Sequence, residues 1–172
     1  DCLLSRGLGD VYKRQDYHYC RDEEERLVRN YLPHRPMGML LTGFDRTEAT
    51  RHLLATSRIP CVHMMELSAA PGIASVGFSQ QAAGEAAAVH LLQQGRKRLA
   101  YVAAQLDPRV MQRGEGFRRA LQAAGVYDPA LELLHPLPSS IGLGCQLFRE
   151  LMQRHPDVDG IFFCNDDLAQ GA

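Results

Sequence analysis

Short apolar runs alternate with helical patterns along most of the chain. Predicted strands lie at residues 37–41, 59–64, 73–78, 98–103, 131–135 and 160–164. The stretches 22–32, 82–94, 110–124 and 141–154 have apolar residues at helical spacing, and further helices end at Ala55 and begin at Asp167. Continuous apolar strands joined by helices are typical of parallel sheets covered on both faces. The pattern therefore predicts an α/β fold.

Polar side chains follow several of these predicted strands. Parallel α/β sheets bind ligands beyond the carboxyl ends of their strands, where the chain turns into the next helix. The side chains at such positions include Ser79, Gln80, Arg109, Asn165 and Asp166. Because these loops carry many hydrogen-bonding groups and few apolar ones, they suit a small polyhydroxylated or acidic ligand.

Composition and charge exclude several classes of protein. The chain has 172 residues, is 45% hydrophobic and carries a formal net charge of -1, whereas a nucleic-acid-binding surface would be clearly basic. Its apolar runs are shorter than the roughly 20 residues that cross a bilayer, so no membrane association is predicted. The five cysteines form no CxxC pair, which favours reduced thiols and a cytoplasmic location over disulfides or a metal site.

Motifs for catalysis or cofactor binding are not found. Gly114-Glu115-Gly116 and Gly142-Leu143-Gly144 both lack the third glycine of a dinucleotide loop. The sequence has no P-loop, no GxSxG elbow and no HExxH pair, and its seven histidines are scattered without metal-ligand spacing. We therefore expect neither enzymatic activity nor a cofactor nor a metal ion.

Three segments carry a resemblance to a known family. They are Ser75-Val76-Gly77-Phe78 with the helix and strand up to Val102, then Arg113-Gly114-Glu115-Gly116-Phe117, and finally the stretch from Asn165-Asp166 to Gly171-Ala172. At these spacings the chain resembles the effector-binding domain of the LacI/GalR family of bacterial transcription repressors. The opening residues 16–19, Glu24-Glu25 and residues 39–43 are most similar to gluconate-operon repressors. The resemblance implies a periplasmic-binding-protein-like fold of two Rossmann-like lobes with parallel sheets, incomplete at both ends.

The resemblance also predicts how the chain is divided. Residues 1–15 show no periodicity and resemble a translated sequencing adaptor, so we expect them to be non-native. Residues 16–83 are expected to be a partial N-terminal lobe, and residues 84–172 a partial C-terminal lobe.

Arg113 and Asp166 are the strongest candidates for ligand contacts. The guanidinium of Arg113 can hold a carboxylate or a pair of hydroxyls, and the Asp166 carboxylate can accept hydrogen bonds from sugar hydroxyls. The resemblance places both in the effector cleft. Other interpretations remain open, namely an exposed arginine on a helix face and an Asn165–Asp166 helix cap. Further candidates are Arg109, Asn165, Ser79 and Gln80, although the family often has Asp-Asn where this chain has Ser79-Gln80.

The function that this resemblance implies is regulation of transcription. A sugar or a sugar acid such as gluconate would bind between the two lobes of a cytoplasmic homodimer and shift its affinity for operator DNA. The DNA itself would be bound by a helix-turn-helix domain outside this segment. A periplasmic sugar-binding protein of a transport system is the alternative, since it shares the two-lobed fold.

Overall fold

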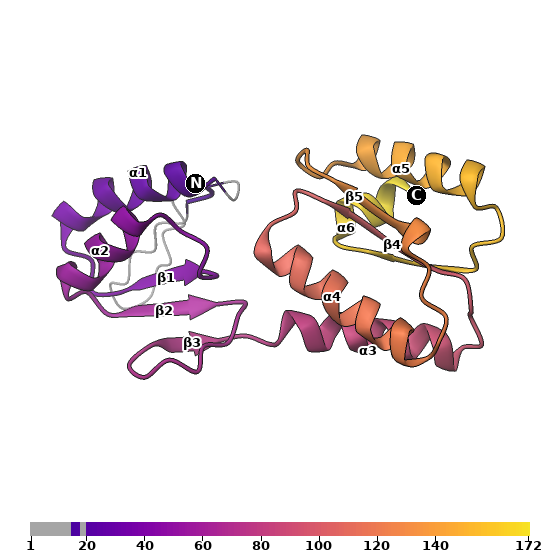
Figure 1. The fold of residues 1–172 in the computed structure, drawn as a ribbon. Helices are drawn as coiled ribbons and strands as arrows, with labels where there is room; N and C mark the ends of the chain where they lie inside the picture. The colour runs from indigo at the N-terminus through magenta and orange to yellow at the C-terminus, as the bar shows by residue number, and fades with distance from the viewer. Residues whose placement is uncertain (1–14, 18–19) are drawn as a thin grey trace, which may run out of the picture. The chain divides into compact units, whose positions relative to one another are not determined.

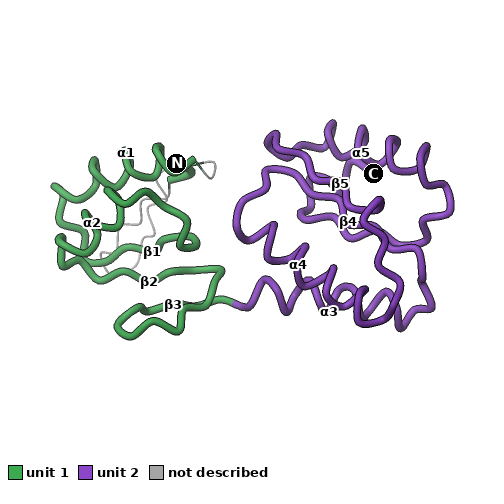
Figure 2. Tube along the Cα trace, in the orientation of Figure 1, with its two compact units in different colours: residues 1–77 green, residues 78–172 purple. Residues whose placement is uncertain are grey.

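The computed structural model describes residues 15–17 and 20–172. The expected non-native segment 1–15 therefore lies, apart from Gln15, outside the described residues. The chain forms two compact units, which divide between Gly77 and Phe78 (Figure 2). The sequence placed this division after Ala83, inside what the structure shows to be a continuous helix, α3 (Gln80–Gln93).

Unit 1 contains a parallel sheet of three strands in the order β1-β2-β3 (Figure 1). The strands are β1 (Met39–Thr42), β2 (Cys61–Met64) and β3 (Ala74–Val76). Helix α1 (Arg21–Tyr31) precedes β1 and continues into a short 3-10 turn, Leu32–His34, and α2 (Glu48–Ser57) connects β1 to β2. Both helices lie on the same side of the sheet.

Unit 2 contains a second parallel sheet, in the order β5-β4-β6. Its strands are β4 (Leu99–Ala104), β5 (Glu132–His135) and β6 (Gly160–Phe163). Helix α4 (Pro108–Ala123) and the 3-10 turn Pro129–Leu131 connect β4 to β5, and α5 (Ile141–Arg154) connects β5 back across to β6. Because parallel crossovers are right-handed and these two run in opposite directions, α4 and α5 cover opposite faces. Helix α3 packs beside α4, and the final helix α6 (Asp166–Gly171) packs beside α5.

The apolar core of unit 2 is built around β4. Every residue of this strand is buried, and the rings of Tyr101, Phe117 and Phe162 pack with centroids 5.3 to 6.0 Å apart. Leu147 and Leu151 of α5 close the core from the other face. The continuous apolar pattern of the sequence thus corresponds to a strand covered on both sides.

Four helices of unit 2 begin with a side-chain cap. The capping residues are Ser79, Asp107, Ser140 and Asn165, each accepting a hydrogen bond from a backbone amide of the first turn. Three of these helices directly follow a strand of the unit 2 sheet, so their polar caps lie at its carboxyl edge. Within the part of the chain that the structure describes, no helix is long and apolar enough to cross a membrane.

Candidate functional site

All six sequence-predicted site residues lie in unit 2. Arg109 and Arg113 belong to the first turns of α4, which follows β4, while Asn165 and Asp166 begin α6, which follows β6. Since β4 and β6 are neighbouring parallel strands, these two groups emerge at the same edge of the sheet. Ser79 and Gln80 begin α3, which packs against α4.

Arg113 is held by Gln80. Its Nη1 donates a hydrogen bond of 2.6 Å to the Gln80 Oε1, and the Gln80 side chain is only 1% exposed. The buried Nε of Arg113 has no hydrogen-bond partner. Among the described residues Arg113 forms no ion pair, so its positive charge is met by a neutral amide.

Close packing of α3 and α4 produces this contact. A Cβ added at Gly84 would lie 1.9 Å from the backbone oxygen of Arg113, and one added at Gly116 would lie 1.9 Å from that of Gln81. No side chain fits at either position, so the two backbones touch there. The glycines therefore fix the separation across which Arg113 reaches Gln80. The Arg-x-x-Gly spacing was visible in the sequence, but its partner on α3 was not.

Arg109 has a carboxylate beside it. Its Nε lies 3.4 Å from the Asp107 Oδ1, and the side chains are 12% and 17% exposed. The same carboxylate caps α4 by accepting from the backbone amides of Arg109 and Val110, at 2.9 and 3.3 Å. Much of the Arg109 charge is therefore balanced within its own helix turn.

Ser79 and Asn165 act as helix caps. Ser79 Oγ accepts from the Ala82 amide and Asn165 Oδ1 from the Leu168 amide, both at 3.1 Å. The capping interpretation of Asn165 is therefore confirmed, and one lone pair of each oxygen is engaged. Asp166 follows in the first turn of α6, is exposed, and forms no ion pair with Arg113.

Two buried groups show where the Arg113 guanidinium lies. Burial raises the pKa of the Cys164 thiol, and the nearby Arg113 charge partly opposes that shift. Burial likewise raises the pKa of Tyr101, whose hydroxyl donates to the Val110 carbonyl at 2.7 Å, and both the charge of Arg113 and a hydrogen bond from its side chain oppose the shift. Cys164 follows β6 directly and lies two residues before Asp166. Arg113 therefore lies near the carboxyl end of β6.

Sequence reasoning missed a buried polar cluster in unit 1. Arg46, only 3% exposed, donates from Nε and Nη2 to the Glu24 carboxylate at 3.3 and 3.1 Å, and from Nη2 to the Gly43 carbonyl at 2.8 Å. Its Nη1 lies 2.9 Å from Nδ1 of buried His63, whose ring stacks on Phe44. The sequence gives no sign of this cluster, because its contacts join a helix, a loop and a strand at positions about twenty residues apart.

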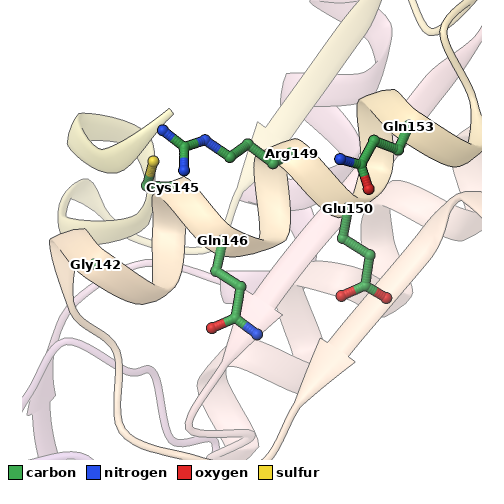
Figure 3. Close-up of a pocket in the computed structure, with 6 residues that line it drawn as sticks. All are labelled: Gly142, Cys145, Gln146, Arg149, Glu150 and Gln153. Atoms are coloured by element: carbon green, nitrogen blue, oxygen red, sulfur yellow. The ribbon is translucent and has the colours of Figure 1, made fainter.

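A pocket of about 430 Å³ lies elsewhere, along one helix (Figure 3). Its lining residues are Gly142, Cys145, Gln146, Arg149, Glu150 and Gln153, all from α5. None of them is a sequence-predicted site residue. Residues 15–17 and 20–172 contain no group of three or more His, Cys, Asp or Glu side chains that could hold a metal ion.

Known proteins resemble this chain over nearly all of its length. Residues 16–172 match the family described as periplasmic binding proteins and sugar binding domain of LacI family. The HTH-type transcriptional regulator GntR of Pseudomonas aeruginosa is 62% identical over 157 residues, and the regulator IdnR of Escherichia coli is 34% identical over 158. These alignments cover 91% of this chain but only 46% and 47% of the relatives. The chain thus spans about half the length of the curated relatives it matches.

A solved structure agrees with these matches. The transcription regulator GntR from Chromobacterium violaceum superimposes with a TM-score of 0.86 and 45% identity, covering 90% of this chain and 57% of that one. The fold predicted from the sequence is confirmed by this likeness. All three relatives are described as transcription regulators.

Proposed function

Because the chain belongs to the family of periplasmic binding proteins and LacI-type sugar-binding domains, we propose that it senses a sugar acid such as gluconate for a transcription regulator. The 62% identity to a transcriptional regulator supports the regulatory role. The single observation that favours an acidic ligand is the half-buried Arg113, which is held by a neutral amide and pairs with no carboxylate among the described residues.

The proposed ligand chemistry follows from the side chains at this edge of unit 2. The Arg113 guanidinium offers parallel N–H donors to a carboxylate. The exposed Asp166 carboxylate would accept from ligand hydroxyls, and Asn165 retains its amide N–H donors for the same purpose. Arg109, with Asp107 beside it, would contribute hydrogen bonds with less net charge. Ser79 would contribute its hydroxyl from the start of α3.

The proposed mechanism is a shift between conformations of the regulator. An effector that binds one conformation more tightly increases its population, and operator affinity changes with it. In this proposal the operator is bound through a DNA-binding domain outside this chain, and the regulator is a cytoplasmic homodimer. The relatives are regulators rather than transport proteins, which favours the regulatory role over the periplasmic alternative.

Isothermal titration of the complete regulator that carries this chain tests the proposal. We expect gluconate to bind, and Arg113→Met to weaken binding by at least about tenfold, since hydrogen bonds to charged groups contribute roughly 1.5–3 kcal/mol. Arg119→Met, on the exposed side of α4, is the matched control and should leave the affinity unchanged. Gluconate should also alter binding of the regulator to operator DNA in a gel-shift assay. Failure of the wild-type protein to bind any sugar or sugar acid would refute the proposed function.

A further inference from the structure

We propose that Gln80 determines the charge preference of the ligand site, because it positions Arg113 without neutralising it. This inference rests on the proposed function, and it assigns Gln80 a role different from ligand contact. Gln80 would act through Arg113, and the uncompensated guanidinium would then select an anionic ligand over a neutral one of the same shape.

The geometry of the contact supports a positioning role. Arginine side chains only donate hydrogen bonds, so the amide atom that faces Arg113 Nη1 at 2.6 Å is the Gln80 oxygen. The Gln80 side chain is 1% exposed in the first turn of α3, where it has little room to adopt another rotamer. The absence of side chains at Gly84 and Gly116 lets α3 and α4 pack with their backbones in contact, which places Gln80 within reach of Arg113. Arg113 is therefore held from one side by a fixed neutral acceptor.

Comparison with the other arginines shows that the neutral acceptor is unusual in this chain. The buried or half-buried arginines of the described residues, apart from Arg113, each pair with a carboxylate: Arg46 with Glu24, Arg98 with Asp128, Arg109 with Asp107 and Arg118 with Glu132. Removing charge from water is costly unless an opposite charge or several hydrogen bonds compensate. Arg113 has neither an ion pair nor a partner for its buried Nε. An anionic ligand would supply the missing charge.

A glutamate at position 80 would change this balance with almost no change in shape. Its carboxylate would replace the amide at the same distance from Arg113 and form the ion pair that the other buried arginines already have. A ligand carboxylate would then face an ion pair with no net charge and would lose most of its attraction to Arg113. A ligand hydroxyl group, which carries no charge, would lose much less binding energy. The substitution should thus convert a site that prefers anions into one that is nearly indifferent to ligand charge.

The test uses two ligands that differ in one group. Gluconate and glucitol have the same carbon chain and hydroxyls, but gluconate ends in a carboxylate and glucitol in a neutral CH2OH. Titration calorimetry on the complete regulator gives the ratio of the two affinities for wild type, Gln80→Glu and Gln80→Leu. We expect wild type to prefer gluconate, Q80E to lose at least about tenfold in gluconate affinity with a ratio near one, and Q80L to weaken gluconate binding while keeping a preference for it.

Gln81→Glu is the matched control, because it adds the same charge one residue away without replacing the acceptor of Arg113. Its ratio should stay within about threefold of wild type, since one added charge nearby is partly screened. An unchanged ratio in Q80E would overturn the inference, as would a wild-type preference for glucitol. If Q80E does not fold, as judged by circular dichroism, a full wild-type gluconate affinity in Q80L overturns it instead. Absence of binding of both ligands, and of every other sugar or sugar acid, to wild type would overturn the proposed function itself.

Discussion

At the scale of single residues, the described part of unit 1 contains a buried ion pair. Arg46 and Glu24 are 3% and 6% exposed, and both nitrogens that face Glu24 donate to its two oxygens. The Gly43 carbonyl and His63 Nδ1 accept the remaining contacts. Because the pair is embedded in hydrogen bonds, removing one member leaves an uncompensated charge away from water.

Replacing Glu24 by Gln should therefore destabilise unit 1 strongly. Breaking a buried pair from one side costs about 3–5 kcal/mol, and we expect the unfolding free energy from urea denaturation to fall by that order. Glu48→Gln removes the partner of Arg51 in an exposed pair and should change stability by less than about 0.5 kcal/mol. Equal effects of the two substitutions would show that the buried Arg46–Glu24 pair contributes no more to stability than an exposed ion pair.

The protonation state of His63 leads to a second prediction at this scale, on how stability depends on pH. Since Arg46 can only donate, His63 Nδ1 must accept, which leaves the ring neutral. The Nδ1 also lies 3.1 Å from the Gly43 carbonyl, but an Nδ1 that accepts from Arg46 carries no proton to donate to that oxygen. Burial lowers the pKa of His63 most strongly. The contact with the Gly43 carbonyl raises it, the Arg46 charge lowers it, and Glu24 and Glu66 raise it by less.

Unit 1 should accordingly lose stability in acid. The unfolded state takes up a proton near pH 6.5 while the folded ring stays neutral, so stability falls as the pH drops below that value. The slope contributed by one proton cannot exceed about 1.4 kcal/mol per pH unit. Urea denaturation between pH 7.5 and 5 measures it, and His63→Gln should remove this component. His52→Gln, at an exposed position, should leave the slope unchanged, and a slope that persists in H63Q would contradict the assignment.

At the scale of elements, glycines determine how the helices of unit 2 pack. Gly116 lies on α4 where it touches the backbone of α3, whereas Gly142 lies on α5 with nothing within 4 Å of an added Cβ. Gly116 is inside α4, whereas Gly142 is in the first turn of α5, so alanine would favour the helix by about 1 kcal/mol at position 116 if space were available and by less at position 142. Only at position 116 does packing oppose this preference.

Gly116→Ala should destabilise the protein, and Gly142→Ala should stabilise it. The added methyl group at position 116 meets the Gln81 carbonyl at 1.9 Å and forces α3 and α4 apart, with a net cost of about 1–3 kcal/mol. The same separation would lengthen the Gln80–Arg113 contact, so gluconate affinity should fall as well. Thermal unfolding and titration calorimetry check both effects. If G116A changed neither the stability nor the gluconate affinity, α3 and α4 could move apart at no cost, and the prediction would be wrong.

The sequence predicted the elements of this fold better than their contacts. Each predicted strand and helix is present within a few residues, because period and caps are local properties of the chain. The Asn165 cap and the apolar run of β4 are examples. The partner of Arg113 was not predicted, since Gln80 lies 33 residues away on another helix. The roles of the site residues toward a ligand remain predictions.

At the scale of the whole molecule, the two units bury very different cores. β4 of unit 2 is entirely buried among apolar side chains. In the described part of unit 1, the buried apolar side chains are Val28 and Leu41 alone. Leu40 and Val76 are 65% and 68% exposed on the sheet face opposite His63, because side chains alternate along a strand. Among the described residues, unit 1 therefore buries far fewer apolar side chains than unit 2 does.

Amide hydrogen exchange on this chain should show that unit 1 opens more readily than unit 2. β2 and β4 are matched for comparison, since each is the central strand of a three-stranded parallel sheet. Local opening needs less free energy where fewer apolar contacts are broken, so amides of β2 should exchange at least about 100-fold faster than those of β4. Glu24→Gln should accelerate exchange in β2 and leave β4 unchanged, because the pair it breaks lies within unit 1. Equal protection of the two strands would show that unit 1 is as stable as unit 2 despite its small core.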